Sequence, residues 1–82
     1  MVNVFYAPLF RKKIKKFKDN SLKKRLKTQI KKIIYSPEIG KPMKFCRKGT
    51  REVYVKPFRL SYFYSKDRNK ILFLEIYHKD EQ

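Results

Sequence analysis

Residues 53–79 read VYVKPFRLSYFYSKDRNKILFLEIYHK, and this stretch decides the fold. Apolar and polar residues alternate along much of it, and the polar run of residues 66–70 divides it near its middle. Alternation is typical of strands that bury one face, and a short polar turn between two such runs is typical of a β-hairpin. The pattern predicts strands over about residues 51–56, 58–65 and 70–78.

The first half of the chain predicts one strand and two helices. Residues 2–6 are β-branched and aromatic, which favours a short strand. Apolar residues then recur at helical spacing, first over about residues 8–18 and again up to about residue 35. Pro8 suits the first turn of a helix, where its missing N–H is not needed. Pro37 ends the second helix, because the residue before a proline avoids the α region.

These elements follow the order β-α-α-β-β-β, with residues 37–50 as a connecting loop. The order predicts an α+β fold in which both N-terminal helices pack on one face of a mainly antiparallel sheet. A chain of 82 residues has room for a small core, so we expect a single domain over residues 1–82.

The charge of the chain points to a polyanionic partner. The formal net charge is +16 and the sequence pI is about 10.2. Residues 7–37 hold twelve lysines and arginines and one acid, Asp19. Such a balance fits nucleic acid, an anionic membrane or an acidic protein.

Several classes of protein are disfavoured by the sequence. The longest strongly apolar run, residues 71–74, is far too short to cross a bilayer. The N-terminus is apolar first and basic second, the reverse of a secretory signal. Cys46 is the only cysteine and cannot form a disulfide within the chain, which fits a reducing compartment. We interpret it as a packing residue. We therefore expect a cytoplasmic protein without a membrane partner.

No metal or other cofactor is expected. The chain has one histidine, one cysteine and dispersed carboxylates, which do not make a ligand set.

Alternation along the strands sorts the side chains of the predicted sheet into two faces. The apolar set should meet the helices: Val53, Val55, Leu60, Tyr62, Tyr64, Leu72, Leu74 and Ile76. The opposite set holds Glu52, Tyr54, Lys56, Arg59, Ser61, Phe63, Phe73, Glu75, Tyr77 and Lys79. Of these, Tyr54, Lys56, Arg59, Ser61, Glu75, Tyr77 and Lys79 should be displayed together on the open face. His78 has the parity of the core but stands at a strand end, where it could turn either way.

The open set places three cations, Lys56, Arg59 and Lys79, beside two tyrosines, Tyr54 and Tyr77. Cations and aromatic rings together suit RNA, whose phosphates need positive charge and whose unpaired bases stack on rings. Two plainer interpretations stand beside this one. Exposed lysines on strands often serve solubility and protect sheet edges, and tyrosines are ordinary cross-strand packing partners.

Lysines also line the solvent side of both predicted helices, where they could hold RNA phosphates or simply be solvated. They are Lys12, Lys13, Lys16, Lys23, Lys24, Lys27, Lys31 and Lys32. Binding that depends on them should weaken steeply with salt.

The chain resembles the RelE/ParE toxin superfamily, and within it the RelE-type mRNA interferases, over nearly its whole length. The helices close on Tyr35-Ser-Pro37, and Gly40-Lys-Pro-Met43 is similar to the family's G-K-x-L link. Phe58-Arg-Leu-Ser-Tyr62 is similar to Y-R-L-x-Y, and Ile76-Tyr-His-Lys79 to V-x-H/K-R. No one of these motifs is diagnostic, but their order and spacing together are fairly specific.

The resemblance implies the toxin of a type II toxin–antitoxin pair. Such a toxin is a ribosome-dependent endoribonuclease that cuts translated messenger RNA. It is silenced by an acidic, RelB-like antitoxin in a hetero-oligomeric complex.

The resemblance also implies roles for individual residues. Arg59 matches the arginine that steadies the reacting phosphate, and Lys56 matches a lysine of the family's K-x-K strand. Tyr54 takes the place of that motif's first lysine, Lys79 stands where a second arginine is common, and His78 resembles a histidine of some relatives. The chain ends without the extension that supplies a tyrosine in well-studied members, so either another residue replaces it or activity is reduced.

The chemistry of RNA cleavage asks for similar groups. Arginine clamps phosphate in a planar, bidentate way and keeps its charge. A lysine among other cations is pushed toward its neutral form, so Lys56 is a candidate base. His78 titrates near neutrality and is a candidate acid, and Tyr54 or Tyr77 could stack on a splayed base.

Other functions stay open from sequence alone. A ParE-like toxin that acts on a topoisomerase, or an RNA-binding module without catalysis, would share the fold and charge. A basic amphipathic segment over residues 9–35 could bind a membrane surface, but the β-region that follows it argues against this.

Overall fold

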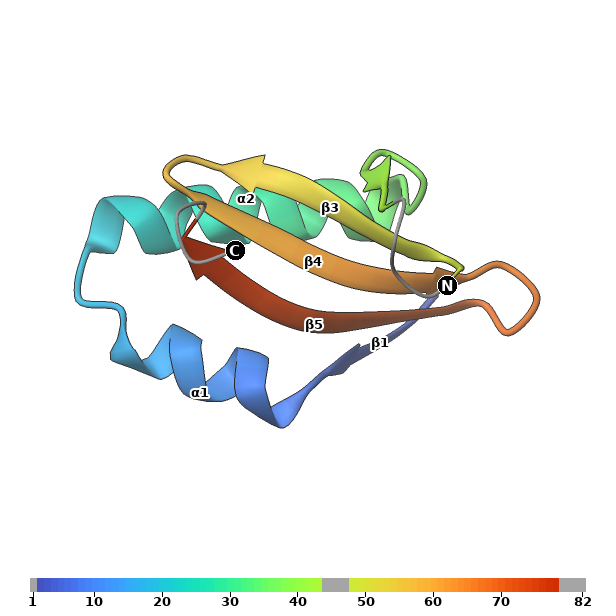
Figure 1. Ribbon diagram of the computed structural model, residues 1–82, viewed down its shortest axis with the longest axis horizontal. Helices are drawn as coiled ribbons and strands as arrows, with labels where there is room; N and C mark the ends of the chain where they lie inside the picture. The colour runs from blue at the N-terminus through green and yellow to red at the C-terminus, as the bar shows by residue number, and fades with distance from the viewer. Residues whose placement is uncertain (1, 44–47, 79–82) are drawn as a thin grey trace.

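The computed structural model describes residues 2–43 and 48–78 (Figure 1). Its elements are β1 (Asn3–Tyr6), α1 (Pro8–Lys16), α2 (Asn20–Tyr35), β2 (Lys41–Pro42), β3 (Thr50–Val55), β4 (Phe58–Ser65) and β5 (Lys70–His78). The predicted order of helices and longer strands is confirmed. The two-residue strand β2 was not predicted: it lies within residues 37–50, which were expected to form a loop.

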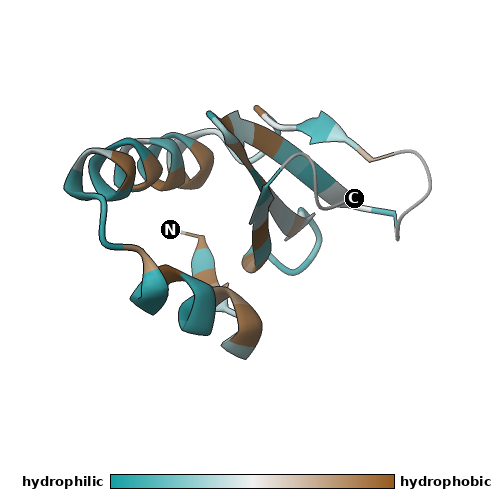
Figure 2. Cartoon of the chain, turned by 60° about the vertical axis from the view of Figure 1, so that its left-hand side comes forward, coloured by the Kyte–Doolittle hydropathy of each residue, from teal (hydrophilic) through white to brown (hydrophobic). Residues whose placement is uncertain are grey.

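The strands form one sheet in the order β1-β5-β4-β3-β2. β1 pairs with β5 in parallel, and the remaining neighbours are antiparallel. Both helices lie on the same side of this sheet, so its other side is uncovered by any helix (Figure 2). The predicted α+β architecture, with both helices on one face, is therefore confirmed.

Local sequence explains where the helices begin and end. Pro8 is in the first turn of α1, and α1 ends at Lys16 because Phe17 is already extended. This end is two residues earlier than the sequence pattern predicted. At the start of α2, the carboxylate of Asp19 accepts hydrogen bonds from the backbone N–H groups of Ser21 and Leu22. This N-cap satisfies donors that the helix itself cannot pair.

The core lies between the helices and the inner face of the sheet. Its most deeply buried side chains are Phe10, Leu26, Ile33, Leu60, Tyr62, Ile71, Phe73 and Ile76. The ring of Phe73 stacks on those of Phe10 and Tyr6, with 5.7 Å and 5.3 Å between centroids. This aromatic cluster joins α1 to the sheet, since Phe10 comes from α1 and Tyr6 from β1.

A β-bulge corrects part of the predicted core. Ser61 pairs with Glu75 but Tyr62 pairs with Phe73, so Leu74 is the extra residue on β5. One extra residue reverses the facing of the strand on one side of the bulge. Phe73 is therefore completely buried, although alternation had placed it on the open face.

The same bulge moves two predicted core residues to the open face. Leu72 pairs with Phe63, and both are only partly buried, as is Leu74. Beyond the bulge the predicted parity was right: Ile76 is in the core, while Glu75 and Tyr77 keep the parity of the open face. Ser61, which was predicted to be open to solvent, is buried.

The buried Tyr62 holds the segment that follows α2. Its hydroxyl donates a hydrogen bond to the carbonyl of Pro37 (2.8 Å) and accepts one from the N–H of Gly40 (2.9 Å). Arg51 Nη1 donates to the carbonyls of Glu38 (3.0 Å) and Gly40 (2.7 Å). Burial raises the pKa of Tyr62 above its usual value, so the hydroxyl keeps the proton that it donates.

Gly40→Ala should destabilise the protein, because a Cβ at this position would lie 2.5 Å from the Tyr62 hydroxyl. Relieving that clash breaks the hydrogen bonds of a buried group, which costs on the order of 1–3 kcal/mol. Thermal unfolding followed by circular dichroism should show a melting temperature lower by at least several degrees. Lys41→Ala at the neighbouring exposed position is the control, and equal melting temperatures for the two variants would contradict this account.

Candidate functional site

The uncovered face of the sheet brings predicted site residues into one row. Tyr54 on β3, Arg59 on β4 and Tyr77 on β5 are direct cross-strand partners, so their side chains leave the sheet on the same side. Their common face is opposite to that of Leu60, which is fully buried beneath the helices. The predicted grouping of Arg59 with two tyrosines is therefore present in the structure.

A carboxylate joins two members of this row. Glu52 Oε1 lies 3.4 Å from Arg59 Nη1, and Glu52 Oε2 accepts a hydrogen bond of 3.0 Å from the Tyr77 hydroxyl. The side chain of Glu52 is 22% exposed and that of Arg59 is 35% exposed. The guanidinium is thus held in place by an acid while part of it stays open to solvent.

Glu52 was not among the candidate site residues. Alternation along β3 already placed it on the face of Tyr54, because residues two positions apart in a strand share a face. A carboxylate on that face can accept a proton, which arginine and a protonated lysine cannot do.

A hollow of about 420 Å³ opens beside this cluster. Lys41, Glu52, Tyr54 and Arg59 line it, so its wall combines two cations, one carboxylate and one aromatic ring. Tyr54 is 52% exposed, which leaves its ring accessible. Lys41, on β2, is the cross-strand partner of Glu52. The hollow can therefore accept a phosphate together with a flat ring.

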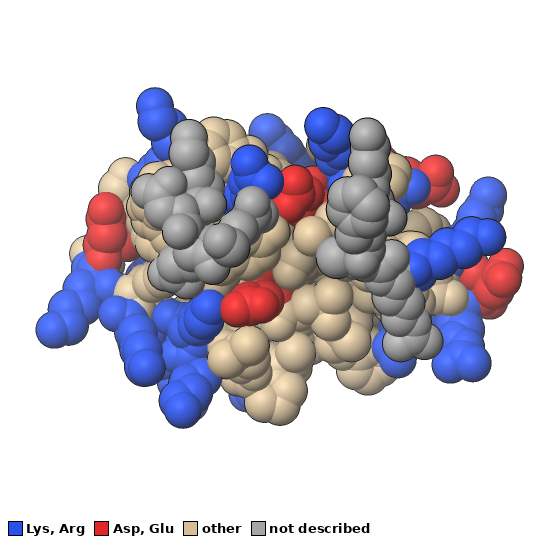
Figure 3. Space-filling model, viewed as in Figure 1, with Lys and Arg blue, Asp and Glu red and all other residues tan. Residues whose placement is uncertain are grey.

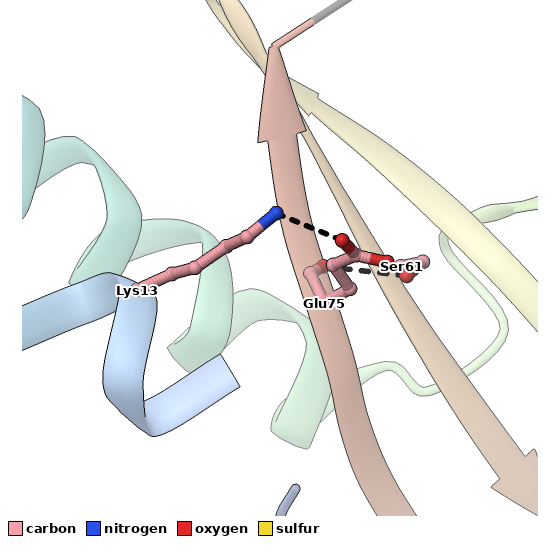
Figure 4. A network of polar contacts seen from close by, with 3 residues as sticks. All are labelled: Lys13, Ser61 and Glu75. Atoms are coloured by element: carbon pink, nitrogen blue, oxygen red, sulfur yellow. Dashed lines mark hydrogen bonds and ion pairs between the residues drawn. The ribbon is translucent and has the colours of Figure 1, made fainter. Parts of the chain in front are cut away.

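A second polar contact lies at the bulge. Lys13 Nζ on α1 reaches Glu75 Oε1 at 2.8 Å, and the Ser61 hydroxyl donates to the backbone carbonyl of Glu75 at 3.3 Å (Figure 4). Lys13 was predicted to belong to the solvated stripe of the helices. That prediction was wrong in this respect: its amine forms a half-exposed ion pair that links α1 to β5.

Lys56 is placed beside the row rather than in it. β3 ends at Val55, one residue earlier than predicted, so Lys56 lies in the turn between β3 and β4. Its backbone carbonyl accepts a hydrogen bond of 2.8 Å from Arg25 Nη1 on α2, and its side chain is exposed. The turn leads within three residues to Arg59.

His78 lies on the other face of the sheet. It pairs with Phe58, whereas the next residue pair along the strands is Arg59 with Tyr77. Successive side chains in a strand point to opposite faces, so His78 points away from the side of Arg59. The two rings meet edge to face, with 5.4 Å between centroids, and Phe58 in turn contacts Phe17 behind the sheet. The structure does not bring the histidine together with Arg59. Lys79 and Cys46 lie outside the described residues.

The lysines of the helices are mostly exposed. Lys12, Lys16, Lys24, Lys27, Lys31 and Lys32 are open to solvent, and Lys23 is half-buried. Neither helix contains an acidic residue. Figure 3 shows lysine and arginine side chains gathered mostly around the outline of the molecule in this view, whereas the fewer acids are scattered, some near the middle and others at the left and right edges.

Two further observations concern the described residues. No group of three or more histidine, cysteine, aspartate or glutamate side chains there could hold a metal ion. None of the helices seen in residues 2–43 and 48–78 has the length and apolar composition needed to span a membrane.

The arrangement of helices and sheet defines a class of small α+β proteins that includes RelE. The chain superposes on the isolated E. coli RelE toxin with a TM-score of 0.80 at 12% identity, covering 95% of this chain and 84% of that one. YafQ in the E. coli DinJ–YafQ complex gives 0.81 at 19% identity, covering 99% and 97%. The RelB–RelE antitoxin–toxin complex of Methanococcus jannaschii gives 0.74 at 18% identity, covering 94% and 92%.

The sequence itself identifies the family. A model of the ParE toxin of the type II toxin–antitoxin system parDE matches residues 4–82, so the chain belongs to this family of toxins. The predicted membership in the RelE/ParE superfamily is therefore confirmed. A comparison with curated protein sequences found no match.

Proposed function

We propose that this chain is the toxin of a type II toxin–antitoxin pair and acts as a metal-independent endoribonuclease on messenger RNA. The observation that carries the proposal is the cluster of Arg59, Glu52, Tyr54 and Tyr77 on the helix-free face. It places a phosphate clamp, an acid–base group and the ring of Tyr54 around one open hollow, with Tyr77 beside them on the same face. The family match supports the toxin assignment, and the geometry of this cluster supports the nuclease assignment.

Arg59 is assigned to the phosphate at the cleavage point. Charge-assisted hydrogen bonds of arginine to carboxylate or phosphate usually measure about 2.7–2.9 Å, and the Arg59–Glu52 distance of 3.4 Å is longer. A half-exposed and loose ion pair contributes little, on the order of 0–1 kcal/mol. An incoming phosphate can therefore replace Glu52 on the guanidinium at small cost.

Glu52 is assigned to the proton of the attacking hydroxyl. Displaced from Arg59 but still next to it, the carboxylate takes the proton of the ribose 2′-OH, and the 2′-oxygen then bonds to phosphorus. Arg59 stabilises the extra negative charge of this state. The bond from phosphorus to the 5′-oxygen breaks, which leaves a 2′,3′-cyclic phosphate on one fragment.

The departing 5′-oxygen needs a proton to become a hydroxyl. Tyr77 is on the same face and its hydroxyl already contacts Glu52, so we assign the proton donor to Tyr77. The roles of Lys56 as base and His78 as acid stay predictions, as does that of Lys79. Tyr54 is assigned to stacking on a base next to the cut.

The partners follow from charge and family. An acidic, RelB-like antitoxin and the ribosome with its message are both polyanionic, which suits a chain of net charge +16. Both would be met in the cytoplasm, where we place the protein. The fold is shared with proteins solved as toxin–antitoxin complexes, which supports a hetero-oligomer with an antitoxin.

A direct test uses ribosomes programmed with a defined message and the purified chain. Cleavage within the translated region, giving fragments with 5′-hydroxyl and cyclic phosphate ends in the presence of a chelator, is the expected result. An intact message under conditions in which the chain arrests growth would refute the nuclease assignment.

The exposed helix lysines should hold ribosomal RNA. The triple substitution Lys24→Glu, Lys27→Glu and Lys31→Glu should release the chain from ribosomes in co-sedimentation at moderate salt. Each phosphate contact contributes roughly 0.7–0.9 to the slope of log affinity against log salt, so the triple variant should have a distinctly flatter slope.

A single lysine-to-glutamate substitution outside the helices serves as a matched control. Lys66→Glu changes an exposed lysine in the turn between β4 and β5, which is part of neither helix. Unchanged ribosome binding by the triple variant would show that the helices provide no specific contact. The same would follow if Lys66→Glu lowered ribosome affinity as much as each substitution in the triple variant does.

The family match also favours a second candidate, a ParE-like toxin that is not a nuclease. Brief induction separates the two. Translation arrest with cut messages supports the nuclease, whereas a DNA-damage response with intact messages supports a toxin that acts on a topoisomerase.

A further inference from the structure

Tyr35 is the most exposed large apolar side chain in the described part of the molecule. It is the last residue of α2 and is 92% exposed. Ile39, four residues later, is 53% exposed. The preceding turn of the helix carries Lys31 and Lys32, which are also exposed. We call Tyr35, Ile39, Lys31 and Lys32 the Tyr35 patch.

The ring of Tyr35 has open space beside it in two directions. One hollow of about 340 Å³ is lined by Lys31, Lys32, Tyr35, Ser36 and Ile39. A second of about 480 Å³ is lined by Val2, Lys31, Ile34, Tyr35, Pro37, Tyr64 and Asn69. Within the described residues no other aromatic ring stacks on Tyr35. The ring therefore stands as a ridge with room for a flat group against it.

The lysines of α2 lead to this ring. Lys24, Lys27, Lys31 and Tyr35 follow one another at intervals of three or four residues, so they share one side of the helix. At 1.5 Å per residue this series covers about 16 Å of helix. A strand of nucleic acid that follows the lysines with its phosphates would bring a base to Tyr35 at the end of the series.

We propose that the Tyr35 patch binds an unpaired base of RNA, with Tyr35 as the stacking platform and Lys31 and Lys32 on the adjoining phosphates. Single-stranded RNA is held in this way, by cations on the backbone and aromatic rings on the bases. A peptide partner would need a concave apolar groove for its side chains, whereas Tyr35 protrudes between two hollows. The observations therefore favour a nucleobase over a protein segment.

The patch is separate from the proposed site of cleavage. Tyr35 lies at the end of α2, whereas the turn that precedes Arg59 contacts Arg25 near the start of α2. The inference rests on the proposed contact of the helix lysines with RNA, but it does not depend on cleavage. The site would select RNA with an exposed base, such as a bulge or loop, over a continuous duplex.

The test measures RNA binding in a background that cannot cut. Each substitution is made in the Arg59→Ala chain, and fluorescence anisotropy reports its affinity for a labelled single-stranded RNA and for the same RNA as a duplex. Tyr35→Ala and Tyr35→Leu should each weaken single-strand binding by about fivefold or more. Tyr35→Phe should bind like the parent, because it keeps the ring.

The controls separate stacking from charge and from folding. Tyr35→Ala should leave the slope of log affinity against log salt unchanged, while Lys31→Ala should lower it by about one. Duplex binding should not respond to Tyr35→Ala. Since Tyr35 is almost fully exposed, the melting temperature should not respond either.

Several results would overturn the inference. One is single-strand affinity that survives Tyr35→Ala, and another is a Tyr35→Leu variant that binds like the parent, since leucine has no ring. A third is intact RNA binding by Tyr35→Ala with lost binding to an acidic, RelB-like antitoxin, which would assign the patch to that partner. None of these depends on whether the chain cuts messages, so the outcome is independent of the nuclease assignment.

Discussion

Arg59→Ala should reduce message cleavage by on the order of 10²–10³-fold, the effect of removing one donor that is aimed at the charge of a transition state. Arg59 is the only guanidinium in the row of side chains that faces the hollow, and its partner there is Glu52. No neighbouring side chain in the described structure offers the same planar pair of donors at that position. Growth arrest on induction should disappear together with cleavage.

The fold should survive this change. Arg59 is partly exposed and its ion pair with Glu52 is long, so the loss of stability should be small, on the order of 0–1 kcal/mol. Arg59→Lys keeps the positive charge but lacks the two parallel N–H donors of the guanidinium, so it should retain only part of the cleavage rate. Arg68→Ala, in the exposed turn between β4 and β5, is the matched control and should cut normally. Full cleavage by Arg59→Ala would remove the residue on which the proposed mechanism depends.

Glu52→Gln should lower the cleavage rate by roughly 10²–10⁴-fold, the usual contribution of a general base. Glutamine has the shape of glutamate but only one acceptor oxygen, so it can keep the hydrogen bond from Arg59 or the one from Tyr77, and it cannot take a proton. RNA affinity should stay the same or rise, because a negative charge leaves the hollow. Single-turnover cleavage on programmed ribosomes, with separate measurement of RNA affinity, checks both expectations.

The comparison with Lys56→Ala distinguishes two assignments of the base. If Glu52 takes the proton, Lys56→Ala should change the rate far less than Glu52→Gln does. If Lys56 takes the proton, Lys56→Ala should lower the cleavage rate far more than Glu52→Gln does. Glu52→Gln with the parent's rate would reduce Glu52 to a residue that only positions Arg59 and Tyr77.

The sequence allowed most of the fold to be predicted, because its apolar residues follow two regular periods. Helical spacing located α2, and the alternation of β3 and β4 placed Tyr54 and Arg59 on one face. These are local properties of the chain. They hold wherever a strand or helix is regular.

What could not be predicted depends on contacts between distant segments. The bulge at Leu74 is set by the pairing of β4 with β5, and it buries Phe73 against α1 rather than exposing it. The contact of Lys13 with Glu75 joins residues from α1 and β5, which sequence spacing does not relate.

The candidate site shows the same division. Alternation brought Arg59 and the tyrosines together correctly, but it could not decide the side taken by His78 at the end of β5. Packing against Phe58 decides it, and places the histidine behind the sheet. Alternation also placed Glu52 on the face of Tyr54, but its contacts with Arg59 and Tyr77 join three strands and are visible only in three dimensions.

Primer-extension mapping of messages after brief induction of the parent chain and of Arg59→Ala tests most directly whether the chain uses Arg59 to cut translated messages. New 5′ ends are expected within translated regions for the parent, and none for Arg59→Ala at equal protein level. Identical breaks from both chains, or growth arrest by the parent without any breaks, would contradict this mechanism.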